Sequence, residues 1–216
     1  YKAIGVFQTQ EEIDSYISPA TGKPIQPNAA PGDTKFEDLN GDGVISDDNE
    51  DRTMIGKPNP DWMVGLTVAA DWNGFDLSAF FQGSFGADVF DALRRYELAA
   101  VNYTSDALER WTGPGTSNSM PRIVLGDTPK NFRPSTLLVH DASFLRLRNL
   151  QVGYTLPAQL TRKAYIQRLR FYASFDNLLT ITGYKGMDPE IGSTMGIDKG
   201  VYPQARVYTF GLNLTF

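Results

Sequence analysis

The segment 62–85, WMVGLTVAADWNGFDLSAFFQGSF, decides the fold expected for this chain. From residue 62 to 72, apolar side chains occupy every second position, and apart from Met63 the positions between them hold small or polar residues. The alternation resumes over 75–85, after the pair Asn73-Gly74. Period-two alternation is typical of β-strands with one apolar face, and Asn-Gly is typical of a two-residue type I′ turn. The segment therefore predicts a β-hairpin.

The length of the hairpin indicates where it lies. Each arm has about 11 residues. Strands in globular proteins usually have ~5–6 residues, whereas a tilted strand needs about 9–11 residues to cross a bilayer. The length therefore favours a membrane β-barrel over a sheet with a covered core.

Later segments show the same alternation and predict further strands at 142–156, 168–178 and 205–216. In the first of these, the apolar positions change parity near Asn149. This change predicts a β-bulge, because one inserted residue moves the following side chains to the opposite face. The faces opposite the apolar ones are rich in Gly, Ser, Thr, Asn, Gln and Arg, as a wet barrel lumen would tolerate. A sixth strand is expected to begin near Tyr1.

Long and short connections alternate between these strands, as they do in outer-membrane barrels. Residues 86–141 and 180–204 form the long connections, which we expect to be extracellular loops. The expected fold is all-β, the C-terminal portion of a transmembrane antiparallel β-barrel. Residues 62–216 would supply the barrel strands, and residues 1–61 would form an extracellular loop region with an Asp-rich loop.

Within the long loop 86–141, two pieces have helix-compatible sequences, 87–99 and 105–111. Long ordered connections of this kind are usually functional.

Composition excludes several classes of protein. The 216 residues include no cysteine, so a disulfide framework, a thiolate metal site and a cysteine nucleophile are impossible. The net charge is −5 and the Lys and Arg residues are scattered, which argues against nucleic-acid binding. No stretch approaches the ~18 apolar residues of a membrane-spanning helix. The sequence opens at Tyr1 without a start methionine or a signal peptide, which suggests a piece of a longer protein.

His140 is the only histidine of the chain. No nucleophile with a nearby base and no paired carboxylates stand out, so we expect no enzyme. His140 itself is expected to be a solvated loop residue at a strand edge.

Five stretches resemble the C-terminal signature of the SusC/RagA family of TonB-dependent transporters. They are PGDTKFEDLNGDGVI (31–45), IGKPNPDWMVGLTVAADWNGFDLSAFFQGSFGADVF (55–90), HDASFLRLRNLQVGYTLP (140–157), FDNLLTITGYKGMDPEIG (175–192) and YPQARVYTFGLNLTF (202–216). They cover most of the chain after about residue 30, in the order of the family. The resemblance implies a 22-stranded barrel around an N-terminal plug, TonB-driven uptake and a SusD-like lipoprotein lid. The plug and the TonB box are expected outside this sequence.

Residues 38–43, DLNGDG, resemble the first half of an EF-hand calcium loop, in which alternate oxygen atoms converge and a glycine permits a sharp turn. The expected Ca²⁺ ligands are Asp38, Asn40, Asp42, Val44 and Asp47. The second half departs from the pattern, because position 12 is Asn49, and the Asp51-Arg52 pair that closes the related family motif comes about two residues late. The alternative is a surface turn whose Asn and Asp side chains bond their own backbone.

The last expected strand resembles the β-signal that the barrel-assembly machinery reads, a terminal aromatic residue preceded by apolar residues on one face. Its residues are Tyr208, Phe210, Leu212, Leu214 and Phe216. The alternative is an ordinary edge strand with an apolar last residue.

Aromatic and charged residues within the strands predict how the two faces are used. About half of five aromatic residues should join the girdles at the membrane interfaces. They are Trp62, Trp72, Tyr154, Tyr172 and Tyr208. Charges should lie toward the lumen or the rim and should pair, because lipid-facing charges cost ~2–4 kcal/mol at the midplane. They are Asp76, Arg146, Arg148, Arg168, Arg170 and Asp176, of which Arg146 is the least comfortable because it precedes the change of parity.

The leading functional hypothesis is TonB-dependent import of nutrient oligomers, glycans or peptides, across the bacterial outer membrane. The expected partners are the lid lipoprotein, TonB, the barrel-assembly machinery and outer-membrane lipid. The alternative is a secreted, calcium-stabilised β-sandwich that binds carbohydrate. Leu66 and Leu212 distinguish the two, because a sandwich would bury them in a closed core.

Overall fold

The computed structural model describes residues 1–216 except 49, 95, 97, 99–100 and 192–194. The chain divides into two compact units. The first contains residues 1–57, 89–140 and 197–199, and the second contains residues 58–88, 141–196 and 200–216. Residues 1–57 and most of the long loop 86–141, which the sequence analysis kept apart, therefore share one unit.

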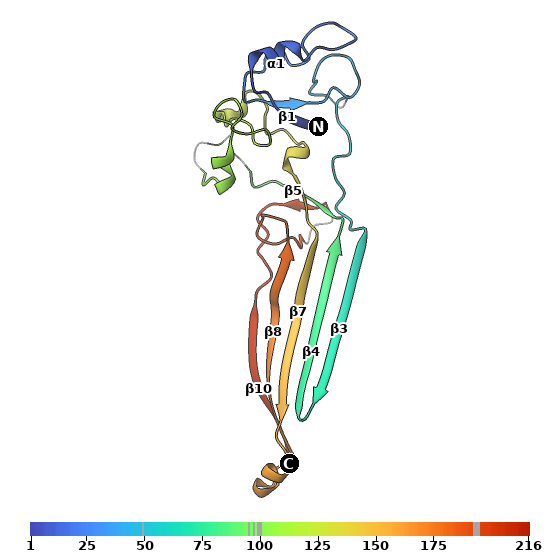
Figure 1. The fold of residues 1–216 in the computed structure, drawn as a ribbon, viewed down its shortest axis with the longest axis vertical. Coiled ribbons are helices and arrows are strands. Elements are labelled where there is room, and N and C mark those ends of the chain that lie inside the picture. The colour runs from blue at the N-terminus through green and yellow to red at the C-terminus, as the bar shows by residue number, and fades with distance from the viewer. Residues whose placement is uncertain (49, 95, 97, 99–100, 192–194) are drawn as a thin grey trace. The chain divides into compact units, whose positions relative to one another are not determined.

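The second unit contains a five-stranded antiparallel sheet with the order β10-β8-β7-β4-β3 (Figure 1). The strands are β3 (Trp62–Trp72), β4 (Phe75–Phe85), β7 (Phe144–Thr155), β8 (Arg168–Thr182) and β10 (Val207–Thr215). All five strands expected from the alternating pattern are therefore confirmed. β8 continues four residues beyond the expected end at residue 178, because it stays paired with β7 as far as Thr182.

Two short connections join neighbouring strands of this sheet. Between β3 and β4, Asn73 has a φ of 49° and Gly74 a φ of 90°. Both angles are positive, as a type I′ turn requires, so the predicted turn is confirmed. Between β7 and β8 lie the short helices α2 (Ala158–Thr161) and η4 (Arg162–Ala164).

The bulge predicted near Asn149 is present in β7. The register of β7 shifts between Leu147 and Asn149 against β8, and it shifts at the same place against β4. Leu147 pairs with Phe81 before the shift, and Leu150 pairs with Ala79 after it. Because directly paired residues lie on the same face of a sheet, Leu147 and Leu150 both lie on the apolar face despite their opposite parity. The bulge therefore keeps the apolar face continuous and leaves Arg146 on the other face.

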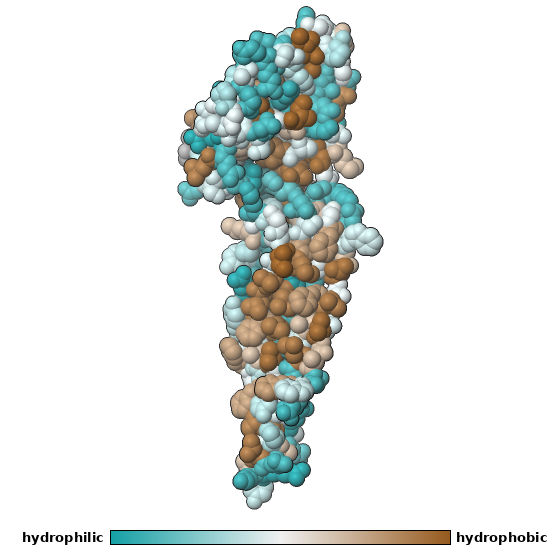
Figure 2. All heavy atoms as spheres, in the orientation of Figure 1, coloured by the Kyte–Doolittle hydropathy of each residue, from teal (hydrophilic) through white to brown (hydrophobic). Residues whose placement is uncertain are grey.

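Within the second unit, no described segment forms a second layer over the apolar face of this sheet. Leu66 is 59% exposed and Leu212 is 58% exposed, and Figure 2 shows hydrophobic residues gathered over the strands. A β-sandwich would bury these side chains against another sheet. The exposure of both residues contradicts the sandwich alternative.

The first unit contains short elements. β1 (Ala3–Val6) pairs antiparallel with β2 (Thr34–Phe36), and β5 (Asp88–Asp91) lies between β6 (Val139–Asp141) and β9 (Ile197–Asp198). The helices are α1 (Gln10–Ser15), capped by the Thr9 side chain, and the 3₁₀ helices η1 (Ser105–Glu109), η2 (Leu125–Asp127) and η3 (Thr136–Leu138).

Three expectations for these loop segments were wrong. The strand near Tyr1 is not a barrel strand, because β1 has four residues and pairs only with β2 among the described strands. The helix expected over 87–99 is contradicted at β5, whose Phe90 and Asp91 pair with β9; residues 95, 97 and 99 lie outside the described residues. His140 lies in β6, with its Nε2 atom 4.0 Å from the Asp91 carboxylate, and is not a solvated loop residue.

The turn between β3 and β4 generates a stability prediction. Gly74→Ala should lower the free energy of unfolding by about 1–2 kcal/mol, because a Cβ atom there is strained at positive φ. The added Cβ would also lie 2.9 Å from the Thr155 carbonyl oxygen. Gly65→Ala is the matched control, since its Cβ would meet only the Phe80 ring at 3.5 Å, and it should change stability by less than about 0.5 kcal/mol. Urea unfolding measures both variants, and equal effects would contradict the expectation.

Candidate functional site

The polar face of the sheet carries every charged residue of its five strands. Pairing assigns six of these side chains to the face that also bears Ser78, Gln82 and Thr209. The seventh, Arg148, lies in the bulge and bonds Gln82 on that face. The seven charged residues are Asp71, Asp76, Arg146, Arg148, Arg168, Arg170 and Asp176. The expectation that strand charges share one face is confirmed.

One ion pair on this face joins β4 to β8, with β7 between them. The Arg170 guanidinium donates to the Asp76 carboxylate, with Nε 2.8 Å from Oδ1, and also to Gln151 at 3.2 Å. Gly153 of β7 makes room for the pair, since a Cβ there would lie 2.5 Å from Asp76 Oδ1. Asp176 accepts a hydrogen bond from Asn149 at 2.7 Å. The predicted pairing of strand charges is thereby confirmed for Asp76 and Arg170.

A second network joins two arginines of β7 to the segment after β8. Arg146 donates to Asp188 at 2.6 Å, to Glu190 at 2.9 Å and to Thr180 at 2.9 Å. Arg148 donates to the other oxygen of Glu190 at 2.5 Å. The Arg146 side chain is only 2% exposed, and removing one partner of a buried ion pair costs about 3–5 kcal/mol. Arg146, expected to be the least comfortable charge, is therefore paired with two carboxylates.

Asp188 and Glu190 were not identified as site residues from the sequence. They lie 42 and 44 residues beyond Arg146, in a loop, and no local spacing connects them to β7. The sequence did offer one signal, two acidic residues spaced by one in Met187-Asp188-Pro189-Glu190 and two arginines with the same spacing, Arg146 and Arg148. Such matching spacings of opposite charge indicate candidate ion pairs.

Asp188 is held in its ionised form. Burial raises the pKa of this carboxyl, but the backbone N–H groups of Gln204 and Glu190 and the Arg146 guanidinium outweigh burial and hold the pKa below its usual range. Stability that depends on ionised Asp188 is therefore fully present above the usual Asp pKa of about 3.9. It is lost as the pH falls through the lowered value.

The Asp-rich loop of the first unit is organised by hydrogen bonds to its own backbone. Asp38 accepts from the N–H groups of Gly41 and Gly43, both at 2.8 Å, and Asp42 accepts from Val44 at 2.8 Å. Asn40 accepts from the Asp42 N–H group at 3.0 Å. This is the pattern of the surface-turn alternative. In the described part of the chain, no three His, Asp or Glu side chains are grouped so that they could hold a metal ion.

Two other acidic residues complete this loop. Asp47, an expected ligand, forms an ion pair with Lys130. Asp51 is fully buried and accepts hydrogen bonds from Leu39 N at 3.1 Å and Ser46 N at 2.9 Å, so its carboxylate closes the loop. Asp51 of the Asp-Arg pair thus closes the loop although it comes late in the sequence. A Ca²⁺ ion at Asp38, Asn40, Asp42, Val44 and Asp47 stays a prediction.

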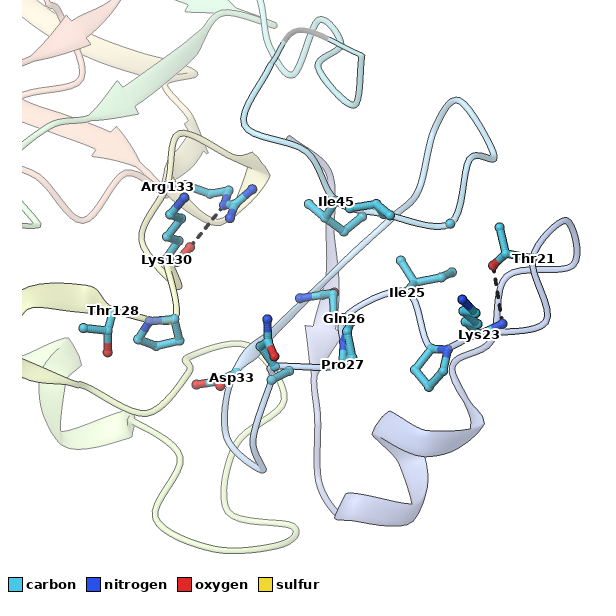
Figure 3. Close-up of a pocket in the computed structure, with 16 residues that line it drawn as sticks. Thr21, Lys23, Ile25, Gln26, Pro27, Asp33, Ile45, Thr128, Lys130 and Arg133 are labelled. Carbon is cyan, nitrogen blue, oxygen red and sulfur yellow. Dashed lines mark hydrogen bonds between the residues drawn. The ribbon is translucent and has the colours of Figure 1, made fainter.

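A cavity of about 680 Å³ lies beside this loop in the first unit (Figure 3). Three prolines and two isoleucines contribute to its lining, which comes from Thr21, Asp33, Arg133 and residues 23–29, 43–45 and 128–130. Lys23 lies on the opposite side from Lys130 and Arg133 (Figure 3). Lys130 is paired with Asp47, and the Arg133 guanidinium lies over the Phe36 ring, 5.0 Å from its centroid. Because Lys130 and Arg133 already have partners within the chain, they do not indicate an anionic ligand, and we assign no ligand to the cavity.

Known proteins resemble this chain over most of its length. TonB-dependent receptor P3 of Formosa agariphila is 34% identical over 229 residues, which cover 100% of this chain and 22% of that receptor. TonB-dependent receptor SusC of Bacteroides thetaiotaomicron is 31% identical over 191 residues, covering 88% of this chain and 18% of SusC. The RagAB peptide importer in its closed-closed state matches with a TM-score of 0.65 and 32% identity, covering 79% of this chain and 19% of that one.

The chain belongs to the SusC/RagA family of TonB-dependent receptors. It spans about a fifth of the length of the curated relatives that it matches. No family model matches the chain. Proteins of the SusC/RagA family lie in the outer membrane. The sheet is therefore a section of a transmembrane barrel wall, with its apolar face toward lipid and its polar face toward the lumen.

No helix in the described part of the chain is both long enough and apolar enough to cross a membrane.

With the two faces of the sheet assigned to lipid and lumen, one of the five aromatic residues expected in the membrane girdles can be placed. Tyr172 pairs with Gly153 and Gly211, so it lies on the lumenal face and is not a girdle residue. The missing side chain at Gly211 admits its ring, since a Cβ there would lie 2.5 Å from the Tyr172 hydroxyl oxygen. Trp62 and Trp72, at the two ends of β3, and Tyr154 and Tyr208 lie on the lipid-facing side, and their place in a girdle stays a prediction.

The β-signal also stays a prediction. Tyr208, Phe210, Leu212 and Leu214 all lie on the lipid-facing side of β10, as that signal requires, and Phe216 follows the strand.

The Asp-rich loop generates a prediction about proteolysis. Asp51→Ala should speed thermolysin cleavage between residues 39 and 50, because two backbone N–H groups lose their acceptor. Each lost hydrogen bond should destabilise the closed loop by about 1–3 kcal/mol. Asp48→Ala is the control, since the Asp48 carboxylate is exposed and accepts from the Ser46 hydroxyl and the Glu50 N–H group at the surface of the loop. Equal cleavage rates in the two variants would contradict the role of Asp51.

A second arm of the same assay tests the calcium prediction. Calcium should slow cleavage of the unmodified loop, and Asp38→Asn should remove the protection. An identical cleavage rate with and without calcium would contradict calcium binding by this loop.

Proposed function

We propose that the whole protein imports nutrient oligomers, glycans or peptides, across the bacterial outer membrane with energy delivered through TonB. This chain would supply a section of the barrel wall, strands β3, β4, β7, β8 and β10, together with long extracellular loops. Its relatives support this proposal, since they include TonB-dependent receptors and a peptide importer.

The one-sided distribution of charge carries the proposal. A strand 11 residues long that bears charges on one face and exposed Leu, Val, Phe and Trp side chains on the other fits a boundary between lipid and water. The polar face can then border an aqueous path through the membrane. A channel wall needs this arrangement, whereas a soluble sheet needs its apolar face covered.

A surface lipoprotein similar to SusD is the proposed lid of the importer. The support is the relationship to SusC and to the RagAB importer. TonB would act through a part of the protein outside this sequence, and the barrel-assembly machinery would insert the folded wall into the membrane.

A pair of neighbouring substitutions in β3 of the full-length receptor tests the barrel proposal. Leu66→Arg should destabilise the folded barrel by about 2–4 kcal/mol, because it places a charge in lipid. Thr67→Arg should be tolerated, because Thr67 pairs with Phe80 on the lumenal face, one residue along the same strand. The folded fraction is measured in outer-membrane preparations by heat-modifiable migration on a gel.

Import of labelled glycan and peptide oligomers by whole cells tests the transport proposal. Uptake should require the receptor and an intact TonB, and Leu66→Arg should reduce uptake in proportion to the loss of folded protein. Equal tolerance of both arginine substitutions would contradict the lipid-facing assignment. Uptake that continues without the receptor would contradict the transport role.

A further inference from the structure

The segment that follows β8 folds over the polar face of the sheet. β8 ends at Thr182, and the carboxylates of Asp188 and Glu190 then reach the guanidinium groups of Arg146 and Arg148. Arg146 also bonds Thr180, and Arg148 bonds Gln82, both on the lumenal face. The turn Met187–Glu190 therefore lies against the inside of the wall.

The anchorage has several attachment points within one small turn. Arg146 bridges Asp188 and Glu190, and Glu190 in turn bridges Arg146 and Arg148. Asp188 further accepts the backbone N–H groups of Glu190 and Gln204, each at 2.9 Å. One carboxylate thus fixes the shape of the turn, ties it to the returning chain near Gln204 and holds it to β7.

Burial makes docking of the turn close to all-or-none. Asp188 and Pro189 are buried, and the Arg146 side chain is 2% exposed. If the turn left the wall, the buried guanidinium would lose both carboxylates together. A partly displaced turn would keep few of these bonds, because both carboxylates reach the arginines only when the turn is in its docked position.

We propose that the turn Met187–Glu190 is a fixed constriction inside the barrel, held by Arg146 and Arg148, that limits the size of the oligomers that pass. Met187 remains 67% exposed on the anchored turn. Its flexible thioether side chain makes an adaptable contact with a passing solute of variable shape. Arg146 and Arg148 act as positioning residues, and the size limit rests on the import function proposed above.

Protease sensitivity of the full-length receptor tests the anchorage. Lys185 is exposed and precedes the turn, so trypsin cleavage after Lys185 reports its release. Arg148→Gln combined with Glu190→Gln, and separately Asp188→Ala, should speed this cleavage at least about tenfold. Asp76→Asn is the matched control, because it breaks an ion pair on the same face that does not contact the turn, and it should leave the rate within about twofold. Equal rates in all variants would overturn the anchorage.

Labelling gives an independent readout of the same state. This chain has no cysteine, so Met187→Cys in a receptor without other cysteines is a single reporter. With the anchor intact, bulky polyethylene-glycol maleimides should label it more slowly than small ones, and the Arg148→Gln, Glu190→Gln variant should reduce that size dependence. A size dependence that is unchanged by the variant would contradict an anchored constriction.

The size limit is tested by import of one labelled oligomer series of increasing length. The Arg148→Gln, Glu190→Gln variant should raise uptake of the longer members relative to the shortest, and Asp76→Asn should not. An unchanged ratio would overturn the size limit. Failure of the unmodified receptor to import any member would overturn the proposed function instead, while the protease and labelling results would still decide the anchorage.

Discussion

The structure depends on one physical constraint, that one face of the sheet meets hydrocarbon while the other meets water. Backbone groups satisfy each other between neighbouring strands, so side chains decide which face is which. Charges can then occupy only the wet face. The five described strands obey this rule without exception, and the bulge at Arg148 restores the rule where the sequence alone would break it.

Concentration of charge on the lumenal face has its own consequences. Asp76 and Arg170 pair across an intervening strand, and this is possible because Gly153 leaves space for them. Arg146 and Arg148 have no carboxylate opposite them in the neighbouring strands, since Gln82 and Thr180 are neutral. Their counter-ions come from the loop after β8. The same electrostatic requirement that organises the wall therefore also holds the turn Met187–Glu190 inside it.

The sequence predicted what local periodicity encodes. The hairpin at Asn73-Gly74, the five strands, the bulge near Asn149 and the common face of the charges all follow from alternation and turn chemistry. Family resemblance was needed for the identity of the barrel, because periodicity does not distinguish one barrel from another. The division of the loops into one compact unit depends on contacts between distant segments, and alternation carries no such information.

Particular residues show where sequence reasoning failed. Asp188 and Glu190 are partners of β7 only through folding of a loop, so their role has no signature at fixed spacing. The sequence near Tyr1 does form a strand, β1, but this strand pairs with β2 and not with the barrel sheet. The local sequence does not specify which strand will be its neighbour. Tyr172 is amphipathic like a girdle residue, yet the parity of β8 and the space at Gly211 place it on the lumenal face. Asp51 closes the Asp-rich loop through backbone N–H groups, although its spacing departs from the motif.

Site-directed spin labelling along β3 of the receptor in lipid bilayers tests the central claim most directly. Nitroxides at Leu66 and Val68 should be accessible to oxygen, which dissolves in lipid, and protected from a water-soluble nickel reagent. Nitroxides at Thr67 and Ala69 should show the reverse preference, so that accessibility alternates with a period of two. The same accessibility at all four positions, or preference for the nickel reagent at Leu66 and Val68, would contradict a lipid-facing apolar surface.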